Sequence, residues 1–148
     1  MKATFKSYMH GYTGKLDGIV YYYHPIKQIC MGRKYVKPRE STANLRLKAI
    51  MANLQQIAPS DGFKSDCKYY IISFNNNQKS KLNLMISWNN LYIKLMFALA
   101  KAYPNIDLAT LTREQIFADN LPCQSIKIAV EAGLLAKVRD LHMLGSLI

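Results

Sequence analysis

Acidic residues are scarce in this chain, which has nine Asp and Glu against twenty Lys and Arg and a net charge of +11 over 148 residues. Catalysis by paired acids needs two carboxylates that converge in a cleft, and no spacing among these nine indicates such a pair. Five of them lie in residues 104–148, at helix positions typical of a surface. The sequence therefore predicts a protein that is not an enzyme, uses no cofactor and has no evident small-molecule substrate.

Cysteine and histidine are equally few. The three cysteines, Cys30, Cys67 and Cys123, are far apart and odd in number, which argues against a disulfide framework and is typical of a reducing compartment. No two Cys or His residues stand at the spacing of metal ligands. We expect each thiol to behave as a small buried hydrophobe, and we expect no metal site.

A long apolar run is also lacking. The richest stretch, residues 91–100, contains Lys94 and has about half the length of a membrane span. The first six residues, MKATFK, include polar residues where a secretion signal needs an apolar run. We therefore expect no membrane span, and a protein of the cytoplasm, or of a virion or other assembled particle.

The positive charge is concentrated at the N-terminus. Residues 1–48 hold ten Lys and Arg against two acids, a balance of +8, whereas residues 49–103 carry +4 and residues 104–148 carry −1. A field of this sign attracts polyanions such as nucleic acid. Any binding of a polyanion is expected in the first third of the chain.

The chain has the length of one domain, 1–148, in which the pattern marks three zones. Residues 1–40 form a basic β-ribbon zone. The β-branched and aromatic run at 19–24 and a second strand at 28–36 flank a turn, and residues 3–9 are a candidate for a further strand. The fold class is therefore α+β, predominantly helical with an N-terminal antiparallel β-ribbon.

The helical core is expected over residues 41–103. A first helix begins after Ser41 or Thr42, carries an apolar stripe that includes Leu47, and ends before Pro59. A second begins near Asp61 and ends at residues 75–77, and its apolar stripe is Phe63, Cys67, Tyr70, Ile71 and Phe74. The third, over 80–103, is apolar around most of its circumference, which is typical of a helix central to a core or to an interface.

Short helices are expected in the last zone, 104–148. The segment 112–115 has the pattern of a capping box, and a last helix is predicted over 137–144. Residues 111–135 also follow the order of a helix-turn-helix, in which Gln124, Ser125 and Lys127 would face base edges. The net negative charge of this zone favours plain packing instead.

Basic and aromatic residues alternate in the first third. Lys and Arg neutralise phosphates, tyrosine rings stack on exposed bases, and a two-stranded ribbon fits a DNA groove. Tyrosines in strands are also ordinary packing residues, and lysines solvate sheet edges. The candidate polyanion-binding residues are Lys15, Lys27, Arg33, Lys34, Lys37, Arg39, Arg46 and Lys48.

An assembly surface is the other interpretation of the same region. Edge pairing between ribbons supplies main-chain hydrogen bonds, and tyrosines supply buried area. We therefore expect a homo-oligomer. The candidate interface residues are Tyr21, Tyr22, Tyr23, Tyr35, Trp88 and Met96.

Residues 8–58 resemble small basic proteins of bacterial and prophage genomes. The resemblance rests on the segment GYTGKLDGIV at 11–20, on RKYVKP at 33–38, and on Thr42 and Arg46 in the helix that follows. Those proteins carry a glycine-flanked hairpin, an arginine in the second strand, a proline and a helix begun by threonine. The three tyrosines at 21–23 and the C-terminal helical zone depart from the pattern. The resemblance implies a self-associating structural or assembly protein of phage or prophage origin and transfers no active site; the alternative is a DNA- or RNA-binding protein.

Overall fold

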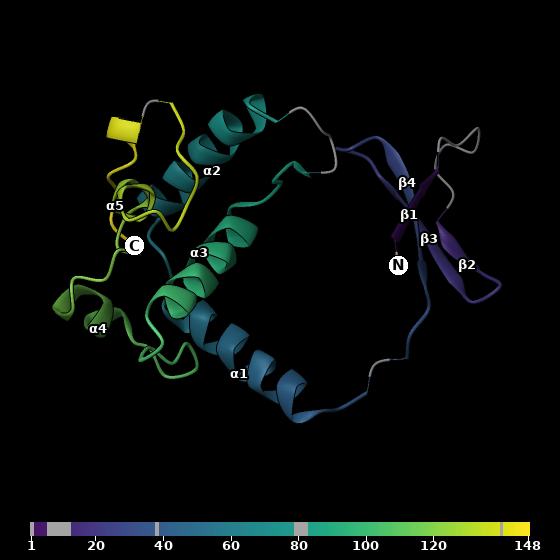
Figure 1. The fold of residues 1–148 in the computed structure, drawn as a ribbon, viewed down its shortest axis with the longest axis horizontal. Coiled ribbons are helices and arrows are strands. Elements are labelled where there is room, and N and C mark those ends of the chain that lie inside the picture. The colour runs from purple at the N-terminus through teal and green to yellow at the C-terminus, as the bar shows by residue number, and fades with distance from the viewer. Residues whose placement is uncertain (1, 6–12, 38, 79–82, 140) are drawn as a thin grey trace. The chain divides into compact units, whose positions relative to one another are not determined.

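The computed structural model describes residues 2–5, 13–37, 39–78, 83–139 and 141–148. It confirms the α+β class, with an antiparallel sheet followed by helices (Figure 1). The sequence predicts one domain with a zone boundary at residue 40. By its backbone contacts the chain divides into two compact units, an N-terminal unit of residues 1–40 with 80–84 and a helical unit of residues 41–79 with 85–148.

Four strands form the sheet of the N-terminal unit, where the sequence predicts a ribbon. They are β1 (Lys2–Phe5), β2 (Gly14–Leu16), β3 (Ile19–His24) and β4 (Ile29–Lys34), in the order β1-β4-β3-β2. Strands at 19–24 and in the 28–36 run are confirmed, and β1 is the described part of the strand expected at 3–9, whose residues 6–9 lie outside the described residues. All neighbouring strands are antiparallel.

The strand that sequence reasoning missed is β2. It joins β3 through Asp17 and Gly18, whose φ angles are 48° and 73°. Positive φ at both central residues is the mark of a type I′ turn, whose twist matches that of the two strands it joins. Asp-Gly is one of the sequences that this turn prefers. The Asp17-Gly18 dipeptide was therefore the signal that could have found this hairpin.

The first two helices begin and end as predicted. Ser41 caps α1 (Thr42–Gln56) by accepting a hydrogen bond from the Asn44 amide, and Ser60 does the same for Phe63 in α2 (Asp61–Asn76). Both caps satisfy a first-turn N–H that has no partner within the helix. Leu47, placed on the apolar stripe of α1 by its spacing, is instead 47% exposed.

The third helix is shorter than predicted, because α3 spans Trp88–Ala102. Residues 79–82 lie outside the described residues, and 84–87 are not helical. The Asn75 side chain donates to the Met85 carbonyl and accepts from the Met85 amide, at 2.7 and 2.9 Å. These two bonds hold Met85 in a segment that is not helical, and Ser87 then caps the helix.

The C-terminal zone contains α4 (Arg113–Ala118), α5 (Ile126–Glu131) and a short 3-10 helix, η2 (Leu141–Met143). The capping box is confirmed, with reciprocal bonds between Thr112 and Gln115. The prediction of a helix over 137–144 is wrong, because among the described residues of this range only those of η2 are helical. Residue 140 lies outside the described residues.

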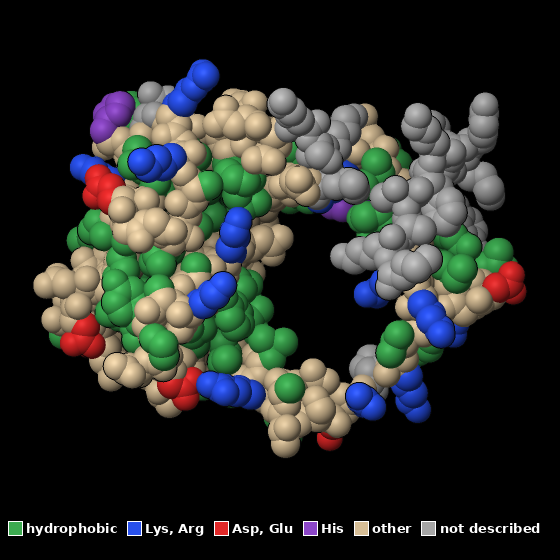
Figure 2. Space-filling view, in the orientation of Figure 1, with side chains coloured by type: hydrophobic (Ala, Val, Ile, Leu, Met, Phe, Trp, Pro, Cys, Tyr) green, Lys and Arg blue, Asp and Glu red, His purple; other side chains and the backbone are tan. Residues whose placement is uncertain are grey.

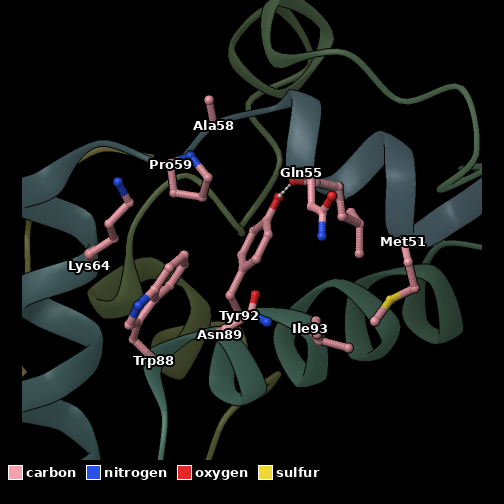
Figure 3. A pocket seen from close by; sticks show the side chains of 10 residues that line it. Met51, Gln55, Ala58, Pro59, Lys64, Trp88, Asn89, Tyr92 and Ile93 are labelled. Atoms are coloured by element: carbon pink, nitrogen blue, oxygen red, sulfur yellow. Dashed lines mark hydrogen bonds between the residues drawn. The ribbon is translucent and has the colours of Figure 1, made fainter.

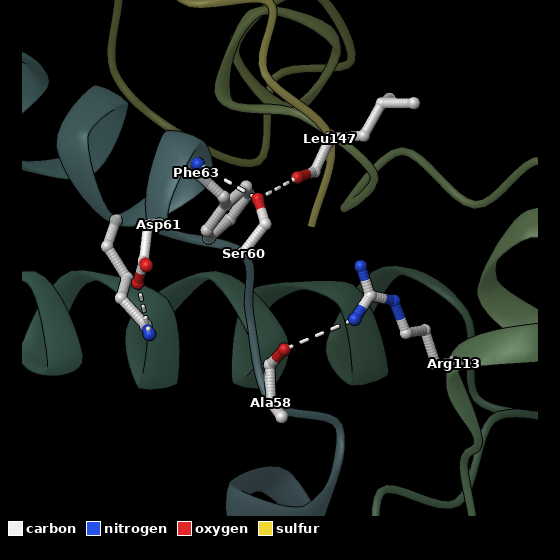
Figure 4. A network of polar contacts seen from close by, with 7 residues as sticks. Ala58, Ser60, Asp61, Phe63, Arg113 and Leu147 are labelled. Carbon is white, nitrogen blue, oxygen red and sulfur yellow. Dashed lines mark hydrogen bonds and ion pairs between the residues drawn. The ribbon is translucent and has the colours of Figure 1, made fainter.

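The core lies in the helical unit, and the last residues of the chain close it. Asp66 on α2 accepts the Ser146 amide at 2.8 Å. Near the start of α2, the Ser60 hydroxyl donates to the Leu147 carbonyl (Figure 4). Ile148 is fully buried, and its carbonyl accepts from the Arg113 guanidinium. Segments about 80 residues apart in sequence are thus tied together.

Candidate functional site

The register of the sheet gives its two faces different chemistry. Residues opposite each other in an antiparallel pair project from the same face, and successive residues alternate between faces. The cationic face is defined by Lys15, Val20, Tyr22, His24, Ile29, Met31 and Arg33. The apolar face is defined by Gly14, Leu16, Ile19, Tyr21, Tyr23, Cys30, Gly32 and, at one end, Lys34. The three consecutive tyrosines are therefore divided, two on the apolar face and one on the cationic face.

Two cations stand on one rung of the cationic face. Val20 of β3 pairs with Lys15 on one side and with Arg33 on the other, so the backbones of the two cations are roughly 10 Å apart, two strand spacings. The backbone of Lys2 pairs opposite Arg33 on the same rung. Lys15 and Arg33 are exposed, and neither forms an ion pair with any residue that the structure describes. Their charge is therefore open to an anion from outside.

Aromatic side chains accompany this rung. The Lys15 ammonium lies 3.8 Å from the centre of the Tyr35 ring, a cation–π contact that positions the side chain and keeps its charge. Tyr22 lies one rung further along the same face, partly exposed, and its hydroxyl is 3.7 Å from the Met31 sulfur. Tyr22 thus adds a partly exposed ring to the cationic face.

The apolar face is only partly covered by the described part of its own unit. Between residues 13 and 37, Gly32 alone is buried, and it has no side chain. All six residues of β3 are only partly buried, and Leu16 is 56% exposed. Apolar side chains are therefore gathered on a face that the described residues leave partly open.

The eight predicted polyanion-binding residues do not form one cluster. Lys15 and Arg33 share the cationic face, whereas Lys34 belongs to the opposite one. Lys27 lies in the β3–β4 turn, and two more, Lys37 and Arg39, are exposed after β4. Figure 2 shows Lys and Arg side chains spread over this unit.

The remaining two, Arg46 and Lys48, are exposed on α1 in the helical unit. Arg46 lies 3.9 Å from Asp107, and both side chains are largely exposed. An exposed pair of this kind contributes little to stability. Of the eight predicted residues, Lys15 and Arg33 therefore share the cationic face of the sheet with the ring of Tyr22.

The predicted interface residues of the third helix have other positions. Met96 is fully buried in the core of the helical unit, which removes it from any surface. The third helix has the narrow polar side that its sequence leaves beside the apolar residues, with Asn90 and Lys94 exposed, and its buried apolar residues pack into the core of their own unit. Trp88 is partly exposed at the first turn, with the Lys64 ammonium 5.7 Å from its ring centre.

Trp88 borders a pocket of about 290 Å³ between α1, the start of α2 and α3 (Figure 3). The Tyr92 hydroxyl, inside this pocket, donates to the Leu54 carbonyl at 3.1 Å. Lys64 is held by Asp61 at 2.9 Å. These polar groups at the pocket are thus already engaged with the protein.

A larger pocket of about 680 Å³ lies between α2 and the C-terminal segment. It is lined by exposed Tyr69, Ile72 and Met143. The buried Asp66 also borders it, bonded to the Ser146 amide. Its lining is mixed, because Ser73, Asn76, Asn77 and Arg139 also border it, and its one buried carboxylate already has a structural partner.

Thiols and metal ligands give no further site. Burial raises the pKa of Cys67 and of Cys123 to about 12, so both thiols stay protonated at neutral pH and are poor nucleophiles. Among the residues that the structure describes, no group of three or more His, Cys, Asp or Glu residues could hold a metal ion.

The helix-turn-helix interpretation of 111–135 is not supported by the side chains it requires. Gln124 is buried, and its amide donates to the Ile116 carbonyl at 2.9 Å. Ser125 is buried as well and caps α5 through the Ile128 amide. Both side chains pack within the protein, so neither faces outward to read a base.

In the described part of the chain, no helix combines the length and the apolar character needed to cross a bilayer. Comparison with family models, curated proteins and solved structures finds no match.

Proposed function

We propose that this chain is a non-enzymatic structural protein that self-associates through the apolar face of its sheet. The supporting observation is that every side chain of residues 13–37 is only partly buried or is exposed, although Ile19, Tyr21 and Tyr23 share that face. A sheet needs an apolar face packed against another surface to be stable, and burying apolar area contributes roughly 25 cal/mol per Å². The open face therefore favours assembly.

A second copy is a suitable partner for geometric reasons. Gly14 stands beside Tyr21 on the same rung, so a ring from another copy finds room there. A two-fold axis repeats such a contact, because a two-fold interface uses the same patch on both partners. The resemblance to prophage-associated proteins agrees with a role in an assembled particle.

Light scattering across a concentration series tests this proposal. We expect the native chain to form dimers or larger species, and Leu16→Ser to raise the dissociation constant by about ten- to a hundredfold, since burying a leucine contributes about 1.5–3 kcal/mol. The matched control is Leu45→Ser on α1, since Leu45 is 55% exposed against 56% for Leu16. A monomer at every concentration, or equal effects of the two variants, would contradict self-association through this face.

We propose nucleic-acid binding as the second candidate function. It is favoured by one observation, that exposed Lys15, Arg33 and Lys37 have no carboxylate partner among the described residues. Cations without counter-charges bind phosphates with an affinity that falls as salt rises. A titration of the chain into labelled oligonucleotide at low and high salt tests it, and affinity that does not change with salt would contradict it.

A further inference from the structure

We infer that the two faces of the sheet have separate partners, so that single-stranded nucleic acid lies across the cationic face while copies of the chain pack through the apolar face. This inference rests on both proposed functions and adds which face each partner uses and which form of nucleic acid is bound. The strand register places adjacent residues on opposite faces of the sheet. Arg33 and Lys34, for example, are neighbours in β4 but project from opposite faces, and the inference follows from this arrangement.

The width of the sheet argues against docking in a DNA groove. Two strands fit the major groove, which is roughly 12 Å wide. The sheet has four strands, and its outermost strand axes are about 14 Å apart, three spacings of about 4.8 Å, before any side chain is counted. It is therefore too wide to enter the groove, although the two-strand ribbon predicted from the sequence would fit.

An open sheet face suits an unpaired strand instead. Bases of single-stranded nucleic acid are free to stack on aromatic side chains, which a duplex prevents. The cationic face offers Tyr22 one rung from Arg33, so a base on the ring and a phosphate on the guanidinium occupy neighbouring positions. Lys15, held beside Tyr35 at 3.8 Å, takes a second phosphate across the rung.

The apolar face lacks this combination. Its one cation on a described strand is Lys34, at the end of the face opposite Ile19, and the rest of the face is glycine, aliphatic, tyrosine and cysteine. Phosphates placed there would lose hydration without gaining several cations. Charge complementarity thus assigns the nucleic acid to the cationic face and leaves the apolar face to a second copy.

Fluorescence anisotropy with a labelled 12-nucleotide oligothymidylate, and with a duplex of the same length, tests the inference at low salt. We expect tighter binding of the single strand. The fall of log affinity with log salt should become less steep by roughly 0.7 for each phosphate that a variant no longer binds. Arg33→Gln should weaken binding by about tenfold. The control Lys34→Gln removes the same charge from the next residue and should weaken it less than twofold.

A second pair of variants examines the ring. Tyr22→Leu should weaken binding of the single strand by about tenfold and Tyr22→Phe by little, because stacking needs the ring and not the hydroxyl. Circular dichroism checks that each variant remains folded. Equal losses for Arg33→Gln and Lys34→Gln would overturn the assignment to one face, and equal binding of duplex and single strand would overturn the stacking role.

The two faces are tested independently of each other. Leu16→Ser should dissociate the oligomer in light scattering yet bind the short oligonucleotide within about twofold of the native chain. Arg33→Gln should do the reverse. Absence of any binding at low salt overturns the nucleic-acid proposal alone, and a monomeric native chain that binds oligonucleotide overturns the assembly proposal alone. Variants that lose both activities together overturn the separation of the faces.

Discussion

The spacing of apolar residues in the sequence predicted correctly many of the side chains that are buried. The stripe of α2 includes Phe63, Cys67 and Tyr70, all of which are buried in the core, as their spacing predicted. Periodicity cannot show which apolar residues stay outside, because Leu47 has the same spacing and is exposed. It also cannot distinguish core from interface, as Met96 demonstrates.

Met96 provides a prediction at the residue scale. Its side chain is fully buried, so Met96→Ala should lower the free energy of unfolding by about 2–5 kcal/mol, the cost of a large-to-small change in a core. Urea denaturation followed by circular dichroism measures it. Phe97→Ala is the control, since Phe97 is 39% exposed on the same helix, and an equal loss in both variants would contradict the assigned burial.

The cysteines provide another residue-scale prediction. Burial raises the pKa of Cys67 and Cys123 to about 12, whereas Cys30 is only partly buried on the apolar face. Since the thiolate is the reactive form, we expect one thiol to react with a maleimide at pH 7.5 in the folded Leu16→Ser variant, whose apolar face is not covered by a second copy, and all three in urea. Peptide mass mapping identifies the modified residue, and early labelling of Cys67 would count against this prediction.

At the scale of elements, the sequence predicted most of the fold where a local signal decided the outcome. Ser41 and Thr112 cap their helices as expected because a hydroxyl beside a free first-turn N–H needs no distant partner. The predicted start of α3 was wrong because Asn75, on the preceding helix, holds Met85 outside the helix through two hydrogen bonds. Alternation along β3 already separates Tyr21 and Tyr23 from Tyr22, but placing Lys15 and Leu16 on the two faces required the missed β2–β3 hairpin.

The β2–β3 turn allows a test at this scale. Gly18 has a φ of +73° and nothing within 4 Å of an added Cβ, so Gly18→Ala costs about 1 kcal/mol through the backbone alone. We expect weaker self-association and weaker oligonucleotide binding, because β2 carries Leu16 and Lys15. Gly145→Ala, also with nothing within 4 Å, is the control. Unchanged activities in Gly18→Ala would show that β2 is dispensable.

For the whole molecule, alkaline pH should reduce stability. Burial raises the pKa of Tyr70 to about 12 and raises that of Tyr92 further, as it raises the pKa of the two buried thiols. A group whose pKa is raised on folding favours the folded state fully below its unfolded pKa and loses that contribution as pH rises through its folded pKa.

The window for this loss follows from the ordinary pKa values, about 9 for cysteine and 10 for tyrosine. Urea denaturation should give a constant free energy of unfolding between pH 7 and about 8.5, followed by a steepening decline up to pH 11. Cys67→Ala with Cys123→Ala should make the decline shallower. A free energy that stays level to pH 11 would contradict the burial of these groups.

Ser60 is hydrogen-bonded to Leu147, 87 residues later in the chain, and Asp66 to Ser146, 80 residues later. These two hydrogen bonds affect when the protein can fold during synthesis at the ribosome. The helical unit cannot complete its packing until its final residues leave the exit tunnel, whereas the strands are finished by residue 34. At 5–20 residues per second the delay is roughly 6–23 s. During it, nascent chains on one messenger carry finished strands beside unfinished helices, so neighbouring ribosomes are where the first copies would meet.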